Sequence, residues 1–114
     1  MRIVNQISIQ ELQEMSGHFF EDMVKAVVDV EECNMAVDAE LHADLESILL
    51  KNGSMQENLW GINIYPFFQE NDFIEFDSII NIRPYQNNRS RGVENVDIQS
   101  NIINIVKKIL NNAT

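Results

Sequence analysis

Hydrophobic and polar residues alternate along two neighbouring stretches of the chain, and this alternation predicts a pair of β-strands. Successive side chains of a strand point to opposite faces of a sheet. In residues 59–65 and 73–83 the alternation separates an apolar face from a polar one. The apolar face carries Trp60, Ile62, Ile64, Ile74, Phe76, Ser78, Ile80 and Ile82. The intervening sequence FFQEND has the length of a hairpin connection, so the two strands are expected to be antiparallel neighbours.

A second hairpin is predicted by the same pattern in residues 24–31 and 34–41. Its apolar face carries Val24, Ala26, Val28, Val30, Met35, Val37, Ala39 and Leu41. Residues 2–5 add a short strand before these two hairpins. Antiparallel sheets that are covered on one side only show this alternation, so the polar face is expected to be at least partly open.

Three helices are predicted between and after the strands. Ser8 and Glu11 form a capping box at the start of the first helix, which is expected to end near Asp22. Residues 43–52 carry an apolar stripe at helical spacing, and Gly53 supplies a C-terminal stop. The last helix is predicted over residues 96–110, and its buried stripe is Ile98, Ile102, Ile105, Val106 and Ile109.

These elements predict an α+β fold with a mainly antiparallel sheet of four or five strands, arranged as two hairpins, and with helices covering one face. A chain of 114 residues is long enough to bury a core, and a single globular domain is expected over residues 1–114. With this assignment of faces, Ile62, Ile80 and Ile82 are buried against the last helix. Glu75 and Asn81 are expected to stay out of that layer.

The charge of the chain narrows the choice of partners. There are 8 Lys and Arg residues against 18 Asp and Glu, which gives a formal net charge of −10. Such a surface repels nucleic acid backbones and anionic membranes, so a nucleic-acid partner is not expected. The sequence shows no apolar stretch as long as a membrane span, no signal peptide, and a single cysteine, Cys33, that fits a reducing compartment. These features predict a cytoplasmic protein without a membrane partner.

Carboxylates and amide side chains share the predicted polar face of the sheet. They are Asp29, Asp38, Glu40, Glu75, Asp77, Asn63 and Asn81. Carboxylate and amide oxygens suit hard divalent cations, and His42 follows at the next strand-to-helix junction. Asp38, Glu40 and His42 are therefore the candidate metal ligands. The alternative is a solvated sheet face without a cofactor, whose charges pair across the strands.

Arginines are concentrated just after the last predicted strand, at Arg83, Arg89 and Arg91. Together with the amides at the start of the last helix, they could bind a phosphate or carboxylate. The alternative is that one of them folds back over the sheet and pairs with Asp77, Glu75 or Glu40. We expect this pairing, because basic residues are scarce in the chain. The full set of candidate ligand-binding residues is Asn63, Tyr65, Glu75, Asp77, Asn81, Arg83, Arg89 and Arg91.

Several strings of the chain, taken together, resemble a family of short prokaryotic proteins that is catalogued only as a domain of unknown function. The strings are VKAVVDVE, ELHADLE, LWGINIYP, DFIEFDSIINIRP and NNRSRGVE. The resemblance covers most of the chain, from about Met23 to the last helix. It implies a small soluble cytoplasmic protein, and it supplies no activity, substrate or catalytic residue.

Two functions fit the sequence. The first is a non-catalytic interaction protein, whose open sheet face, with Val27 and Ile79 among its polar residues, binds a protein partner or a second copy as a homodimer. The second is a small enzyme or ligand binder, in which the carboxylates hold a divalent cation and Arg89 or Arg91 holds an anionic group. We favour the first function.

Overall fold

The computed structural model describes residues 1–111, which form a five-stranded sheet with the strand order β1-β3-β2-β4-β5. All neighbouring strands are antiparallel, so the predicted α+β class with an antiparallel sheet is confirmed. The strands are β1 (Arg2–Val4), β2 (Val24–Asp29), β3 (Asn34–Val37), β4 (Leu59–Ile64) and β5 (Ile74–Glu75). The α-helices are α1 (Ile9–Met15), α2 (His42–Lys51) and α3 (Val96–Asn111). Residues 112–114, which the predicted domain includes, lie outside the described residues.

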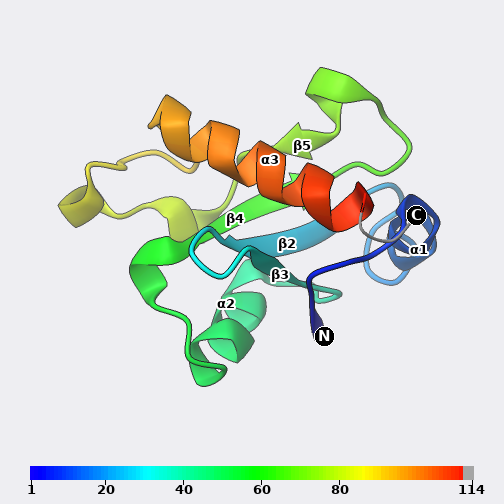
Figure 1. Ribbon diagram of the computed structural model, residues 1–114, viewed down its shortest axis with the longest axis horizontal. Coiled ribbons are helices and arrows are strands. Elements are labelled where there is room, and N and C mark those ends of the chain that lie inside the picture. The colour runs from blue at the N-terminus through cyan, green and yellow to red at the C-terminus, as the bar shows by residue number, and fades with distance from the viewer. Residues whose placement is uncertain (112–114) are drawn as a thin grey trace.

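One face of the sheet packs against α1 and α3, and α3 crosses the front of the sheet in Figure 1. The period-two assignment fails beyond β3, where Asp38 adopts a left-handed φ of +74° and the strand has ended at Val37, so Ala39 is buried on the opposite side of the sheet and Leu41 is 53% exposed. It is confirmed on this face for the three central strands themselves. Their contribution to this first core is Val24, Ala26, Val28, Met35, Val37, Trp60, Ile62 and Ile64. The helices contribute Leu12, Met15, Ile102, Ile105, Val106 and Ile109. Because the α3 residues recur at helical spacing, they form one apolar stripe that lies on the sheet.

The opposite face is also covered, which corrects the prediction of an open polar face. Helix α2 packs against β2 and β3, and the second core on this side consists of Val27, Ala36, Ala39, Leu45, Leu49 and Leu59. The physical reason lies in the apolar residues that interrupt the polar set of the central strands. Val27 and Ala36 are fully buried beneath α2, and removing such side chains from water stabilises the covered arrangement.

Helix α1 begins as predicted but ends early. The hydroxyl oxygen of Ser8 accepts a hydrogen bond from the Glu11 backbone N–H at 3.0 Å, which confirms the N-cap. The helix ends at Met15 instead of near Asp22. The Ser16 hydroxyl donates to the Gln13 carbonyl at 2.6 Å, and Gly17 follows with its low helix propensity.

The last predicted strand is the largest local error in the sequence analysis. Strand β5 pairs with β4 only at Ile74 and Glu75, and the chain then leaves the sheet for two 3₁₀ helices, η3 (Ile79–Asn81) and η4 (Pro84–Gln86). Ile80 packs on the second core and Ile82 is 44% exposed, so the predicted burial of both against α3 is wrong. Ile62 lies in the first core, as predicted.

The segment after β5 can approach β4 closely because β4 carries a glycine. A Cβ atom at Gly61 would lie 2.6 Å from the Cβ of Ser78, closer than real contacts allow. This segment extends to the end of the molecule opposite α1 (Figure 1). Within residues 1–111, every helix is too short or too polar to cross a lipid bilayer.

Candidate functional site

Three of the predicted ligand-binding residues form a hydrogen-bonded network across β4 and β5. The Asn63 amide nitrogen donates to Glu75 Oε1 at 2.8 Å, and the Tyr65 hydroxyl donates to the same oxygen at 3.0 Å. Desolvation, followed by the hydrogen bond to the Glu75 carboxylate, raises the pKa of Tyr65 to about 12. Tyr65 therefore stays protonated at neutral pH and acts here as a hydrogen-bond donor. These hydrogen bonds hold the side chains at this edge of the sheet, and Glu75 Oε1 already accepts from two donors.

Arg91 folds back over the neighbouring carboxylate, as predicted. Its Nε donates to Asp77 Oδ1 at 2.6 Å, and this hydrogen bond raises the pKa of Arg91. Both side chains are about half exposed, so the pair positions the loop more than it stabilises the fold. The pairing leaves Asp77 less suited to hold a cation and Arg91 less suited to hold an anion.

The three candidate metal ligands have separate roles. Asp38 Oδ1 lies 2.7 Å from Nδ1 of His18, and Glu40 is exposed. His42 is buried, and its Nε2 lies 2.8 Å from the carbonyl oxygen of Ile62. Among the described residues, no group of three His, Cys, Asp or Glu side chains is arranged to hold a metal ion.

His42 is a neutral imidazole at physiological pH. A carbonyl oxygen can only accept, so the Nε2 that faces Ile62 carries the proton. Burial lowers the pKa of His42, and the nearby positive charges of Lys25 and Arg91 act in the same direction. The hydrogen bond to Ile62 and the charge of Asp77 oppose this shift without reversing it.

Two further candidates, Asn81 and Arg83, form hydrogen bonds with the part of the β4 edge that β5 does not pair with. The Asn81 side chain accepts from the Gly61 N–H at 2.8 Å and donates to the Gly61 carbonyl at 2.9 Å. The Arg83 guanidinium donates to the Leu59 carbonyl at 2.7 Å and lies 4.2 Å from the centre of the Trp60 ring. Burial lowers the pKa of Arg83. These two side chains make the hydrogen bonds that a longer β5 would have made, so neither is free for a ligand.

The loop that carries Arg89 is fixed by residues that the sequence analysis did not select. The Glu94 carboxylate accepts from the backbone N–H groups of Arg89 and Ser90 at 2.6 and 2.9 Å, and these bonds lower its pKa. The Asn88 side chain donates to the carbonyls of Asn81 and Gly92, both at 2.8 Å, and accepts from the Glu94 N–H. No hydrophobic period marks such residues. The only signal is their type, since asparagine and acidic side chains bind nearby backbone in loops.

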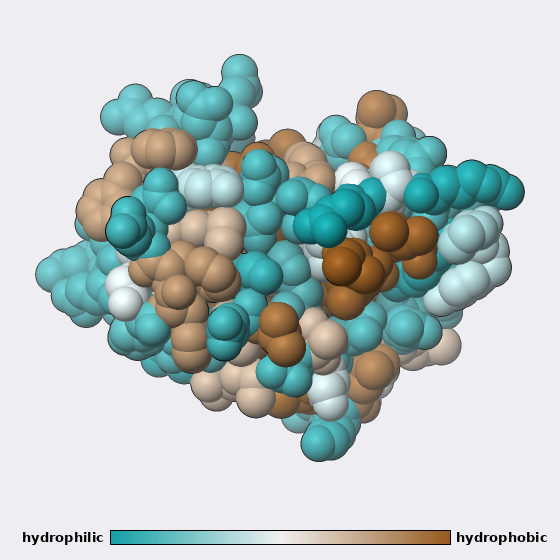
Figure 2. Space-filling view, turned by 180° about the vertical axis from the view of Figure 1, so that it is seen from behind, coloured by the Kyte–Doolittle hydropathy of each residue, from teal (hydrophilic) through white to brown (hydrophobic). Residues whose placement is uncertain are grey.

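This fixed loop exposes large apolar side chains beside an arginine. We call Ile79, Ile82, Tyr85 and Arg89 the platform, and the first three are 69%, 44% and 72% exposed. In Figure 2, strongly hydrophobic atoms lie next to strongly hydrophilic ones at the end of the molecule that carries this loop. Isoleucine, tyrosine and arginine on a preorganised loop have the composition of an interface core.

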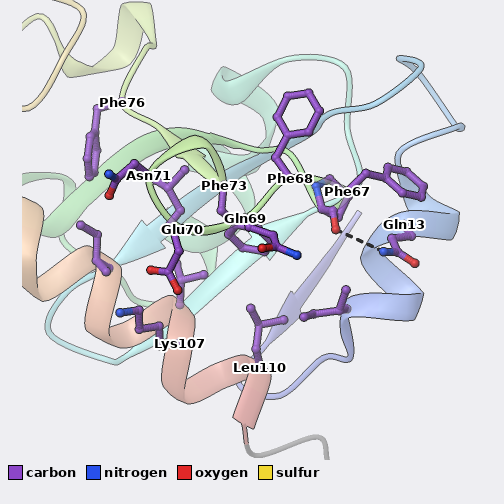
Figure 3. A pocket seen from close by; sticks show the side chains of 15 residues that line it. Gln13, Phe67, Phe68, Gln69, Glu70, Asn71, Phe73, Phe76, Lys107 and Leu110 are labelled. Atoms are coloured by element: carbon purple, nitrogen blue, oxygen red, sulfur yellow. Dashed lines mark hydrogen bonds between the residues drawn. The ribbon is translucent and has the colours of Figure 1, made fainter.

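A separate apolar groove of about 780 Å³ lies on the other side of the molecule, between α1, residues 66–73 and α3. Figure 3 shows its walls, with the Gln13 side chain of α1 bonded to the Pro66 carbonyl at 3.2 Å. Its apolar lining consists of Ile9, Pro66, Phe67, Phe68, Phe73, Ile74, Phe76, Ile103, Val106 and Leu110. The sequence analysis did not predict this groove, because its residues come from three separate elements.

Residues 1–109 match a family model described as a protein of unknown function (DUF5674). The match confirms the resemblance and extends it over α1. No curated protein and no solved structure matches the chain.

Proposed function

Because the chain belongs to the DUF5674 family of proteins of unknown function, its role has to be inferred from its structure, and we propose a non-catalytic interaction protein. The observation that carries this proposal is the platform, a set of exposed apolar side chains and one arginine on a loop fixed by buried amides. A rigid loop loses little conformational entropy on binding. The binding surface in this proposal is therefore the platform at the edge of the sheet, in place of the sheet face itself.

The proposed occupant of the platform is a second copy of the chain. Residues 77–94 carry three arginines against two acidic residues, Asp77 and Glu94, a local net charge of +1, whereas the whole chain has a net charge of −10. Repulsion between two acidic copies is therefore smallest where their platforms meet. Each copy also brings an apolar surface to cover Ile79 and Tyr85 of the other. Dimers with twofold symmetry are the commonest arrangement of soluble oligomers.

The sedimentation or native mass of the chain at micromolar concentration tests this proposal. We expect a dimer whose mass is unchanged by Mg²⁺, and a dimer dissociation constant at least about tenfold higher in Ile79→Glu, the loss typical of a central interface residue. Met55→Glu is the matched control, since Met55 is 60% exposed and lies outside the platform. A monomer at all concentrations, or equal effects of the two substitutions, contradicts the proposal.

The alternative function, a small enzyme or ligand binder with a cation and an anion site, has weaker support. Asp77 and Arg91 would have to hold ligands of opposite charge, but their side chains bind each other. The cytoplasm remains the proposed location, because Cys33 as a single cysteine fits a reducing compartment.

A further inference from the structure

The groove between α1, residues 66–73 and α3 has the features of a site for an extended apolar ligand. Its volume of about 780 Å³ is within the range of small-ligand and peptide-anchor sites, roughly 300–1,000 Å³. Three of its large apolar side chains are exposed within the described residues: Ile9, Phe67 and Phe68 are 46%, 57% and 48% exposed. Contiguous exposed apolar surface of this kind is unfavourable in water unless a partner covers it.

The walls of the groove are held in place before any partner binds. The Gln13 side chain bonds to the Pro66 carbonyl at 3.2 Å, and the Ile7 N–H bonds to the Ile109 carbonyl at 3.3 Å, which ties the start of α1 to α3. The Phe68 ring stacks on Tyr65 with the ring centres 5.5 Å apart. Glu70 holds the turn of the loop in a left-handed conformation, with φ +48°. A preorganised groove loses little entropy when it is filled.

The secondary structure of the occupant follows from the edge of the sheet. A ligand that binds as an added β-strand needs a strand edge with a row of free backbone groups. Strand β5, whose residue Ile74 lines the groove, consists only of Ile74 and Glu75, so its edge is too short for this mode of binding. A helix satisfies its own backbone hydrogen bonds and needs only an apolar channel. Apolar side chains at positions i, i+3, i+4 and i+7 would lie between the helices that form two of the walls (Figure 3).

The charge of the occupant follows from the charge of the chain. The net charge of −10 attracts a cationic segment and repels an acidic one. Glu70 and Lys107 are the charged residues of the lining, so the groove itself has little net charge, and the net charge of the whole chain sets the long-range attraction. A second copy is disfavoured here for the same reason. In addition, the apolar stripe of α3 is already buried in the first core.

We propose that this groove binds a cationic amphipathic helix of another protein. The helix places its apolar face against Phe67, Ile103 and Leu110, and the net negative charge of the chain attracts its lysines or arginines. This surface is separate from the platform, so the inference does not depend on the proposed dimer.

The test uses a labelled synthetic peptide of about 18 residues, above the length of about 12–15 residues below which isolated helices are marginal in water. It is made of leucine and lysine, with the leucines on one helical face. Fluorescence anisotropy measures its affinity for the full chain. We expect binding that weakens at least about tenfold in Phe67→Glu, the loss typical of a hot-spot residue, and changes less than about twofold in Met55→Glu. Phe67→Ala, which adds no charge, is expected to weaken binding in the same direction. The circular dichroism spectrum of each variant confirms that it is folded.

Two control peptides separate the contribution of the apolar face from that of the positive charge. A scrambled peptide with the same charge but no apolar face is expected to bind at least about tenfold more weakly, as is a peptide with glutamate in place of every lysine. Equal binding of the original and scrambled peptides would mean that charge alone acts, and would overturn the proposal. So would unchanged affinity in both Phe67 variants. Loss of the chain's own dimer in Phe67→Glu, with retention in Ile79→Glu, would assign the groove to a second copy instead.

Discussion

Buried asparagines take over hydrogen bonds that a strand would normally make. Asn81 is fully buried, and it satisfies both the N–H and the carbonyl of Gly61 as well as the carbonyl of Arg91 at 3.0 Å. Asn88, which is 2% exposed, likewise bonds to backbone carbonyls, those of Asn81 and Gly92. Unpaired backbone groups in such places are costly, so each amide fixes a stretch of irregular backbone.

Asn81→Ala should therefore destabilise the protein strongly. The substitution leaves the N–H and carbonyl of Gly61 without partners, and we expect the free energy of unfolding to fall by roughly 2–4 kcal/mol in a urea titration. Asn87→Gly is the control, because Asn87 is exposed and has a left-handed φ of +59° that glycine adopts readily. Its effect should stay within about 0.5 kcal/mol. Similar losses in both variants would contradict the proposed role of Asn81.

His42 makes stability depend on pH near neutrality. Its pKa is lowered in the folded state, so the unfolded chain binds more protons as the pH falls below about 6.5. Stability should therefore decrease on acidification from that value, by no more than about 1.4 kcal/mol per pH unit, until the folded-state pKa is reached. His42→Gln should lose this dependence between about pH 7.5 and pH 5.5, whereas the exposed His18→Gln should keep it. Urea titrations across that range provide the measurement, and an unchanged slope in His42→Gln would refute the assignment.

At the scale of elements, the period-two pattern predicts the faces of a strand but not how far the strand extends. Strands β2, β3 and β4 follow it over their full length. In residues 76–83 the same alternation is present, but backbone pairing with β4 ends at Glu75. Ser78 packs against Gly61, and η3 begins directly after it. Local side-chain bonding therefore replaces the ladder that the pattern predicts.

Helix α3 and the segment that contains η3 and Ile82 should respond differently to the same truncation. Ile102 is fully buried between α3 and the sheet, so Ile102→Ala should lower the free energy of unfolding by about 2–5 kcal/mol. Ile82→Ala should change it by less than about 0.5 kcal/mol, because Ile82 is 44% exposed. Ile80, which is partly buried on the second core, should fall between them. Denaturant midpoints with constant m-values give this ranking, and a larger loss at Ile82 than at Ile102 would contradict the described packing.

At the scale of the whole molecule, one sheet serves two cores and leaves two different surfaces. The first core lies beneath α1 and α3, and the second lies beneath α2. The platform is at the end of the molecule opposite α1, and the groove is bounded by α1 itself (Figure 1). Charge separates them further, since three of the eight Lys and Arg residues of the chain lie within residues 83–91, beside the platform. A platform for one partner and a groove for another are therefore both compatible with this fold.

The sequence by itself determined the parts of this protein that depend on local chemistry. The Ser8 cap, the three central strands, the stripe of α3 and the pairing of an arginine with Asp77 follow from residue type and spacing. These features involve neighbours in the chain or a shortage of one kind of charge, and both can be read from the sequence.

The tertiary structure decided everything that depends on which segments meet. Only the packing of α2 on β2 and β3 shows that the second face is covered. Only the end of pairing at Glu75 shows that Asn81 and Arg83 bond to β4 instead of to a ligand. The groove likewise brings together α1, residues 66–73 and α3. Residues far apart in the chain carry no common period, so the free energy of their packing, and not local propensity, placed them together.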